Sequence, residues 1–309
     1  MEKSILIAID GSFCSRKAME YVAEMRLIVK SLHCTLINIQ PKISDFILED
    51  AKKTPQAKAA LKRVTQKNQE NSDGLLYESK NKMIGLGVDE NRIKTVSKQQ
   101  TMGIAKSILD YGNESLFDAI VLGKRGLSRL AETFIGSTTN SVLEHTGTIP
   151  VWSVAGEVKP SKILLAIDGS ESALRTVDHV SFMMGDNPDS NITLLHITPR
   201  LRDYCSIEFD KKDEDISNLI YSGDKECIDS FYAHAANKFK DAGLRESQIK
   251  IKEVKSKLNI GKIIIKEAAE GDFNTLVIGR RGINRSFFMG SVSRYVLNNA
   301  KDCAVWLVP

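Results

Sequence analysis

The chain has 309 residues, of which 42% are hydrophobic and 27% are charged, and its formal net charge is +4. This length and composition are ordinary for a globular protein of two domains. The slight positive charge argues against a dedicated nucleic-acid binder, and no apolar run approaches the roughly 18 residues that span a bilayer. We therefore expect neither a nucleic acid nor a membrane as a partner.

The cysteines and the N-terminal residues indicate the cellular compartment of the protein. The first residues, MEKSILIAID, lack the layout of a signal peptide. The cysteines are odd in number, scattered and without a CxxC pair, which is typical of a protein kept reduced. We expect a cytoplasmic protein. The five cysteines are Cys14, Cys34, Cys205, Cys227 and Cys303.

Apolar runs and helical patterns alternate along the first half of the chain. The predicted strands are Ile5–Ile9, Thr35–Ile39, Ile93–Ser97, Ala119–Leu122 and Val151–Val154. The predicted helices are Arg16–Val29, Ala57–Ile84, Gly103–Tyr111 and Gly136–His145. Ser12 is the expected N-cap of the first helix. Residues 41–90 are Lys-rich and mostly polar, so we expect a single amphipathic helix there, flanked by loops.

The second half repeats the first. Residues 3–12, KSILIAIDGS, return at 161–170 as SKILLAIDGS, and the later motifs return in the same order. The predicted strands are Ile163–Ile167, Ile192–Ile197, Ile249–Val254, Leu276–Ile278 and Val305–Val308. The predicted helices are Ala173–Met184, Lys225–Ala242, Gly261–Glu270 and Ser291–Asn299. The chain is therefore a duplication, and we expect domains at 1–156 and 160–309, joined by a short linker.

Continuous apolar strands joined by helices predict the fold class. This is α/β, with two tandem doubly wound, Rossmann-like domains, each a five-stranded mostly parallel sheet covered by helices on both faces. Right-handed crossovers bring the carboxyl ends of the strands to one edge, where such sheets bind ligands. Asp10, Ile39 and Gly123 each follow or close a strand, so we expect them to meet at that edge.

A glycine loop is the most informative motif. Gly123 and Gly126 follow an apolar strand, and after nine further residues Gly136 and Ser137 open a helix. Such a loop allows close approach to its backbone N–H groups, and the helix start adds more of them with a positive dipole end. Together these form an anion site suited to phosphates. The motif returns in the second half as Gly279, Gly282, Gly290 and Ser291.

This pattern, together with an early strand that ends in Asp-Gly-Ser, resembles the universal stress protein family over nearly the whole chain, as two tandem domains. The resemblance implies an adenine nucleotide alpha hydrolase-like fold and ATP as ligand, with Mg as a candidate companion. It implies that Asp10 bonds the ribose or adenine and that apolar residues hold the base. The implied binding residues of the first half are Ala8, Ile9, Asp10, Ile39, Leu122, Gly123, Arg125, Gly126, Gly136, Ser137 and Thr138.

Plainer interpretations exist for several of these residues. Asp10 and the following glycine could simply form a turn after the strand, because Asp-Gly pairs are common in turns. A duplicated turn would explain Asp168 in the same way. The glycines also suit loop backbone with positive φ. Lys124 and Arg125 are either phosphate contacts or solvated loop charges. The residues alone leave these alternatives open.

The second half departs from the pattern. Only seven residues, INRSFFM, separate Gly282 from Gly290, against nine in the first half. The residues that would donate hydrogen bonds to phosphates remain in the second half, which is therefore the weaker candidate for a site. Its candidate residues are Asp168, Ile197, Gly279, Gly282, Gly290 and Ser291. No other catalytic motif is visible: the histidines lack paired metal spacing, and GxxxxGK[ST] and GxSxG sequences are absent. His196 falls in a predicted core strand.

Three functions remain open from the sequence. The preferred one is an ATP-binding regulator or sensor of stress response that changes shape or protein partners with nucleotide. The alternatives are a slow ATPase on the same fold and a nucleotide-free interaction scaffold. The fifth strands, Val151–Val154 and Val305–Val308, are short and apolar, and an apolar edge invites pairing. We expect them to pair antiparallel in a built-in pseudo-dimer, and a homodimer is a further option.

Overall fold

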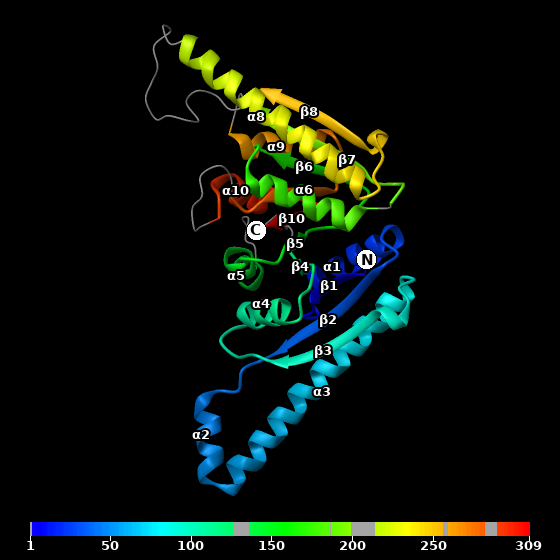
Figure 1. Cartoon of the computed structure of the whole chain (residues 1–309). Helices are drawn as coiled ribbons and strands as arrows, with labels where there is room; N and C mark the ends of the chain where they lie inside the picture. Colours follow the sequence, from blue (N-terminus) through cyan, green and yellow to red (C-terminus); the bar gives the residue numbers. More distant parts are fainter. Residues whose placement is uncertain (1, 126–135, 186, 199–213, 256–258, 282–288) are drawn as a thin grey trace. The chain divides into compact units, whose positions relative to one another are not determined.

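The computed structural model describes residues 2–125, 136–185, 187–198, 214–255, 259–281 and 289–309 (Figure 1). The chain divides into two compact units, and the break between them falls between Ala155 and Gly156. The antiparallel pairing of the fifth strands stays a prediction. Among the described residues, no helix is long and apolar enough to cross a membrane.

The first unit alternates strands and helices as its sequence predicts. Its strands are β1 (Lys3–Ala8), β2 (Leu32–Gln40), β3 (Ile93–Gln99), β4 (Ala119–Gly123) and β5 (Val151–Val154). Its helices are α1 (Phe13–Ile28), α2 (Asp45–Lys53), α3 (Pro55–Gly85), α4 (Ile104–Glu114) and α5 (Ser137–His145), with a 3-10 turn η1 (Glu90–Arg92). The expected cap of the first helix is confirmed, because Ser12 Oγ accepts from the amide of Ser15 at 3.2 Å.

The second unit has the same order of elements. Its strands are β6 (Lys162–Ile167), β7 (Asn191–Thr198), β8 (Ile249–Lys255), β9 (Thr275–Gly279) and β10 (Ala304–Val308). Its helices are α6 (Glu171–Met184), α8 (Glu214–Asp241), α9 (Ile260–Glu270) and α10 (Ser291–Asn299), with a 3-10 turn η2 (Glu246–Gln248). The glycine-loop residues Gly126 and Gly282 lie outside the described residues.

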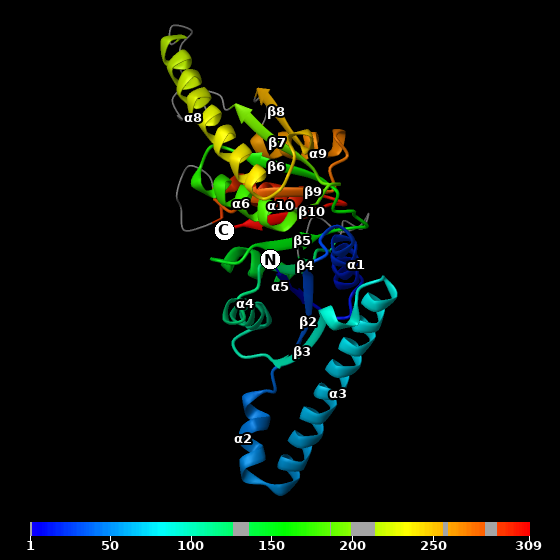
Figure 2. The same cartoon turned by 45° about the vertical axis from the view of Figure 1, so that its right-hand side comes forward.

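The prediction of a single helix within residues 41–90 was wrong, because the segment forms two helices. The hydroxyl of Ser44 caps α2, and Thr54 Oγ1 accepts from the amide of Ala57 at 3.2 Å to cap α3. Pro55 stands at the first position of α3, where a missing N–H costs nothing. The Thr-Pro pair therefore ends one helix and begins the next. Figure 2 shows α2 and the beginning of α3 extending beyond the strands of this unit.

The described strands pair in parallel within each unit, and the topology locates the candidate site. The order is β3-β2-β1-β4-β5 in the first unit and β8-β7-β6-β9-β10 in the second. β1 pairs with β2 on one side and with β4 on the other, so the direction of winding reverses between β1 and β4. In open parallel sheets ligands bind beyond the carboxyl ends of the strands at this reversal.

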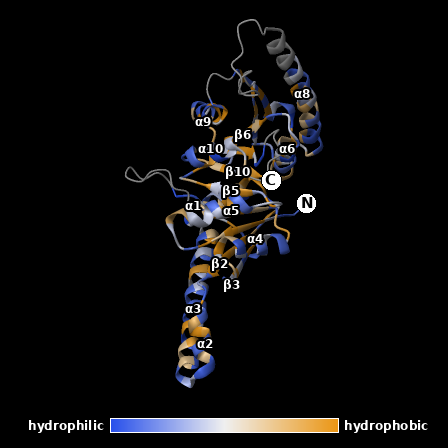
Figure 3. Cartoon of the chain, turned by 90° about the vertical axis from the view of Figure 1, so that its left-hand side faces the viewer, coloured by the Kyte–Doolittle hydropathy of each residue, from blue (hydrophilic) through white to orange (hydrophobic). Residues whose placement is uncertain are grey.

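The helices cover both faces of each sheet, and one aromatic pair recurs in both cores. α6 packs on α8 and α9 packs on α10, and Figure 3 shows the two pairs on opposite sides of β6. In the first unit Tyr21 meets Trp152 edge to face, with ring centroids 6.3 Å apart. In the second, His179 meets Trp306 at 5.6 Å. These pairs bury the largest side chains between the first helix and the last strand.

Candidate functional site

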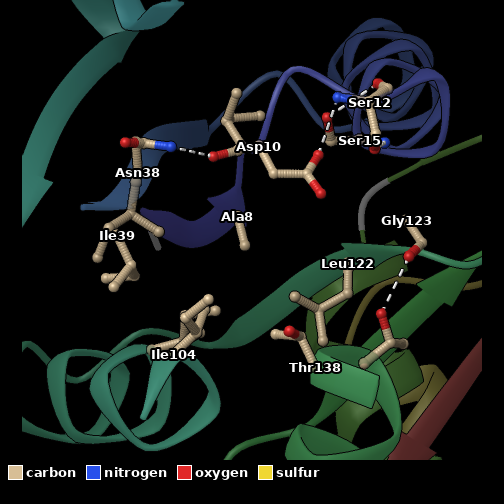
Figure 4. Close-up of a pocket in the computed structure, with 14 residues that line it drawn as sticks. Ala8, Asp10, Ser12, Ser15, Asn38, Ile39, Ile104, Leu122, Gly123 and Thr138 are labelled. Atoms are coloured by element: carbon tan, nitrogen blue, oxygen red, sulfur yellow. Dashed lines mark hydrogen bonds between the residues drawn. The ribbon is translucent and has the colours of Figure 1, made fainter. Parts of the chain in front are cut away.

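A cavity opens at the carboxyl edge of the first sheet, where β1 and β4 diverge (Figure 4). Its walls come from the ends of β1, β2 and β4 and from the first turns of α1, α4 and α5. One end is apolar, with isoleucines from three elements, and the other has hydroxyls and backbone from the glycine loop and α5. The lining residues are Ala8, Ile9, Asp10, Ser12, Ser15, Ile37, Asn38, Ile39, Ile104, Ile108, Leu122, Gly123, Thr138 and Thr139.

The sequence prediction and the cavity overlap in part. Seven predicted residues line the cavity: Ala8, Ile9, Asp10, Ile39, Leu122, Gly123 and Thr138. Gly136 and Ser137 form the start of α5 beside it, and Arg125 lies close to Gly136. The prediction missed the isoleucines of α4 and the polar residues Ser15, Asn38 and Thr139. An isolated asparagine in an apolar strand and a second threonine after Gly-Ser were the available signals.

Asp10 combines a turn with an ionised carboxylate. Its Oδ1 accepts from the amide of Ser12 at 3.0 Å, and Gly11 between them has φ +77°. Burial raises the pKa of Asp10, but hydrogen bonds from Ser12 and Ser15 outweigh it, so the pKa lies below its ordinary value. Both the turn and a charged acceptor at the cavity are therefore present in one residue.

Gly123 and Gly136 of the first unit differ in whether their described surroundings require a glycine. A Cβ on Gly123 would lie 2.2 Å from the carbonyl carbon and oxygen of Cys14, so only glycine lets β4 end against α1. Gly136 has φ −54° and ψ 144°, which any residue adopts. Among the described residues, a Cβ there would meet only Arg125 Nε, at 3.8 Å. Contacts with the described residues therefore do not explain a glycine at this position.

Hydroxyls join α5 to the loop. Thr139 Oγ1 donates to the carbonyl of Gly123 at 3.1 Å, which fixes the helix start beside the end of β4. Thr138 precedes it and lines the cavity. The first amides of a helix lack partners within the helix and carry the positive end of its dipole. This end of the cavity is suited to an anion.

Asn38 lies at the apolar end and is held from two sides. Its Nδ2 donates to the carbonyl of Ile9 at 2.7 Å, and its Oδ1 accepts from Ser72 Oγ of α3 at 2.8 Å. Ser72 in turn shares a hydrogen bond with Ser97 of β3 at 2.7 Å, and Ser97 Oγ accepts from Gln40 at 2.7 Å. A polar network therefore connects the cavity wall with α3.

The second unit repeats the framework but not every contact. Asp168 Oδ1 accepts from the amide of Ser170 at 3.1 Å, and Ser293 Oγ donates to the Gly279 carbonyl at 2.6 Å. The amide of Gly290, however, donates to the carbonyl of Arg280 at 3.0 Å. Within the described part of the first unit, Gly136 makes no such bond.

The remaining second-half candidates also differ from their counterparts. Ile197 is buried near the end of β7, and Ser291 begins α10. Val292 stands where the first unit has Thr138, so one hydroxyl is absent. His196 stands where the first unit has Asn38, and its Nδ1 lies 3.4 Å from the carbonyl of Ile167.

The described residues contain no cluster of three or more His, Cys, Asp or Glu side chains that could hold a metal ion. His179 belongs to the core, where burial lowers its pKa to about 3. Among the described residues that line the cavity, Asp10 is the one carboxylate. It is also the one described lining group able to serve as an acidic ligand or base.

Comparison with known proteins gives the following similarities. The sequence model of the universal stress protein family matches residues 1–154 and again residues 160–309. A universal stress protein of Archaeoglobus fulgidus DSM 4304 is similar in structure, with a TM-score of 0.67 at 17% identity over 99% of this chain and 97% of that one. A functionally unknown protein of Pseudomonas aeruginosa PAO1 has a TM-score of 0.57 at 16% identity, over 99% and 92% of the chains. None of the curated proteins compared with the chain matches it.

Proposed function

Because the chain belongs to the universal stress protein family, as two tandem members, we propose that its first unit binds ATP. The base would lie among Ala8, Ile9 and Ile39, and the ribose beside Asp10. The phosphates would lie at the start of α5, against Gly136, Ser137 and Thr138. Leu122 and Gly123 would border the ribose and first phosphate.

One observation carries the proposal: the described residues around Gly136 give no structural reason for a glycine. Its backbone angles are ordinary, and within the described part of the chain a Cβ would meet nothing closer than 3.8 Å. Amides at a helix start donate hydrogen bonds to phosphate oxygens only if a side chain does not cover them. The start of α5 at Gly136 and Ser137 would be an open cradle for the phosphates, the ionised Asp10 an acceptor for the ribose, and the apolar slot of Ala8, Ile9 and Ile39 a place for the base.

The proposed role is regulation rather than turnover. ATP would change the shape of the protein or its protein partners in stress response, and the link from the cavity through Asn38 and Ser72 to α3 offers a route for that change. The four described cysteines, Cys14, Cys34, Cys227 and Cys303, form no disulfide, which fits a reducing cytoplasm. Mg would reach the site with the phosphates of ATP, and Asp10 is the one carboxylate among the described residues that line the cavity.

Identification of the copurified nucleotide tests the proposal. Protein purified without added nucleotide is denatured, and the released small molecules are separated and identified by mass. We expect ATP in amounts approaching one per chain, and less in the Gly136→Val variant, since a branched side chain would cover the cradle. Protein that carries no nucleotide and binds none on titration would contradict the proposal. Phosphate release over hours, measured on the same sample, distinguishes binding from slow hydrolysis.

A further inference from the structure

We propose that Asn38 is the residue that selects the base, and that it favours adenine over guanine. The inference rests on the proposed nucleotide site and adds its specificity. Six polar side chains line the described cavity: Asp10, Ser12, Ser15, Asn38, Thr138 and Thr139. Five of them belong to the turn before α1 or to the starts of α1 and α5. Asn38 alone lies at the apolar end, where the base would sit beside Ile39 and Ile104 (Figure 4).

An apolar slot does not distinguish one purine from another. Purines of similar size bury similar apolar area, so discrimination has to come from polar groups that the correct base satisfies. A carboxamide presents an acceptor beside a donor. Adenine presents a donor beside an acceptor along its edge, which makes an asparagine or glutamine amide its natural bidentate partner.

The orientation of the Asn38 side-chain amide determines whether it can pair with adenine or with guanine. The Ile9 carbonyl accepts from Nδ2 at 2.7 Å and the Ser72 hydroxyl donates to Oδ1 at 2.8 Å. A carbonyl accepts only from the nitrogen, so the amide cannot turn over without losing this bond. The second hydrogen on Nδ2 and the second lone pair on Oδ1 remain for a ligand. Guanine presents the reversed order, O6 as acceptor beside N1–H as donor, and would need the turned amide.

The second unit provides the contrast. Its histidine at the same place, His196, keeps a ring nitrogen near the β6 carbonyl of Ile167 but has no paired acceptor and donor on one edge. A histidine at position 38 would therefore preserve the bond to the strand carbonyl while removing the amide edge. Asn38→His separates a structural role of Asn38 from a role in base selection, because a purely structural asparagine would be replaced without loss.

Calorimetric titration of the full chain with ATP, GTP and inorganic tripolyphosphate tests the inference. Wild-type protein should prefer ATP to GTP. In Asn38→His the affinity for ATP should fall about tenfold, and the preference over GTP should disappear. Ser72→Ala, which releases only the oxygen side, should reduce the preference less. Binding of tripolyphosphate, which reports the phosphate end alone, should not change in either variant.

Each other outcome has a definite meaning. A folded Asn38→His or Ser72→Ala variant with the wild-type ratio of ATP to GTP affinity would overturn the assignment, and so would wild-type protein that binds both nucleotides equally. In those cases the nucleotide site itself would stand. Wild-type protein that binds tripolyphosphate but neither nucleotide would overturn the proposed function and this inference together. Circular dichroism and urea unfolding confirm that the variants are folded.

Discussion

Thr139 and Gly123 are joined by a hydrogen bond of 3.1 Å from the threonine hydroxyl to the glycine carbonyl. The second unit repeats it with Ser293 and Gly279, at 2.6 Å. In each unit this bond ties the start of a helix to the end of a central strand. It sets where the first amides of the helix point, and so fixes the frame on which an anion would rest.

Removal of this bond in the first unit should weaken ATP binding. Thr139→Val keeps the volume of the side chain and removes the hydroxyl. We expect a loss of about 0.5–1.5 kcal/mol in the free energy of unfolding and a several-fold higher Kd for ATP. Ser293→Ala is the matched change in the second unit and should lower stability with little effect on ATP binding. Urea unfolding and calorimetry measure the two quantities. Equal effects of the two variants on Kd would contradict the assignment to the first unit.

The two glycines of the first unit should respond in opposite ways to a methyl group. Gly123→Ala forces a Cβ to within 2.2 Å of the Cys14 backbone, so we expect destabilisation by about 1–3 kcal/mol or more. Gly136→Ala has an ordinary backbone and meets no described atom closer than 3.8 Å, so unfolding should hardly change while ATP binding weakens. Urea unfolding of both variants, followed by titration of the folded one, checks this. A stable Gly123→Ala protein would contradict the packing argument.

The Asp10 carboxylate should matter beyond its turn. Asp10→Asn keeps an acceptor for the amide of Ser12 and removes the charge. A hydrogen bond to a charged group contributes roughly 1.5–3 kcal/mol, so the Kd for ATP should rise about ten- to hundredfold. Asp168→Asn in the second unit should have a smaller effect. If Asp10→Asn binds ATP as tightly as the wild type, Asp10 serves only the turn.

His179 should make the second unit less stable in acid. Burial beside Trp306 lowers its pKa to about 3, so the folded protein keeps it neutral where the unfolded chain, with an ordinary value near 6.5, takes up a proton. The unfolded state then binds more protons, and stability falls as pH decreases from about 6.5 towards 3, by up to ~1.4 kcal/mol per pH unit. His179→Phe, which cannot titrate, should flatten this slope in urea unfolding series. An unchanged slope would mean that other groups cause it.

Much of the fold could be predicted from the sequence, because its signals are local and occur twice. The alternation of apolar runs with helical patterns, and the return of KSILIAIDGS as SKILLAIDGS, indicate a duplicated parallel α/β fold, which is confirmed. The break between α2 and α3 was missed, although Thr54-Pro55 carries the cap and the first-turn proline. The weak apolar periodicity of that polar segment hid the signal.

The site was harder to predict because its contacts join residues far apart in the chain. Gly123 was interpreted through backbone freedom, but its cause is the close approach of Cys14, which only the packed structure contains. Asn38 was missed since its partners, Ile9 and Ser72, lie on other elements. The replacement of Thr138 by Val292 could have been read from the aligned repeats. The bond from Gly290 to Arg280 depends on the path of the loop, which loop length alone does not give.

Calorimetric titration of ATP into the Gly136→Val and Gly290→Val variants tests the central claim most directly. In the first unit a branched side chain would cover an open cradle, whereas in the second the Gly290 amide is already bonded to Arg280. Backbone donors act only within about 2.7–3.2 Å of their acceptors. We predict that Gly136→Val loses most ATP binding and that Gly290→Val keeps nearly all of it. Loss of binding in Gly290→Val, with retention in Gly136→Val, would place the nucleotide in the second unit and contradict the account.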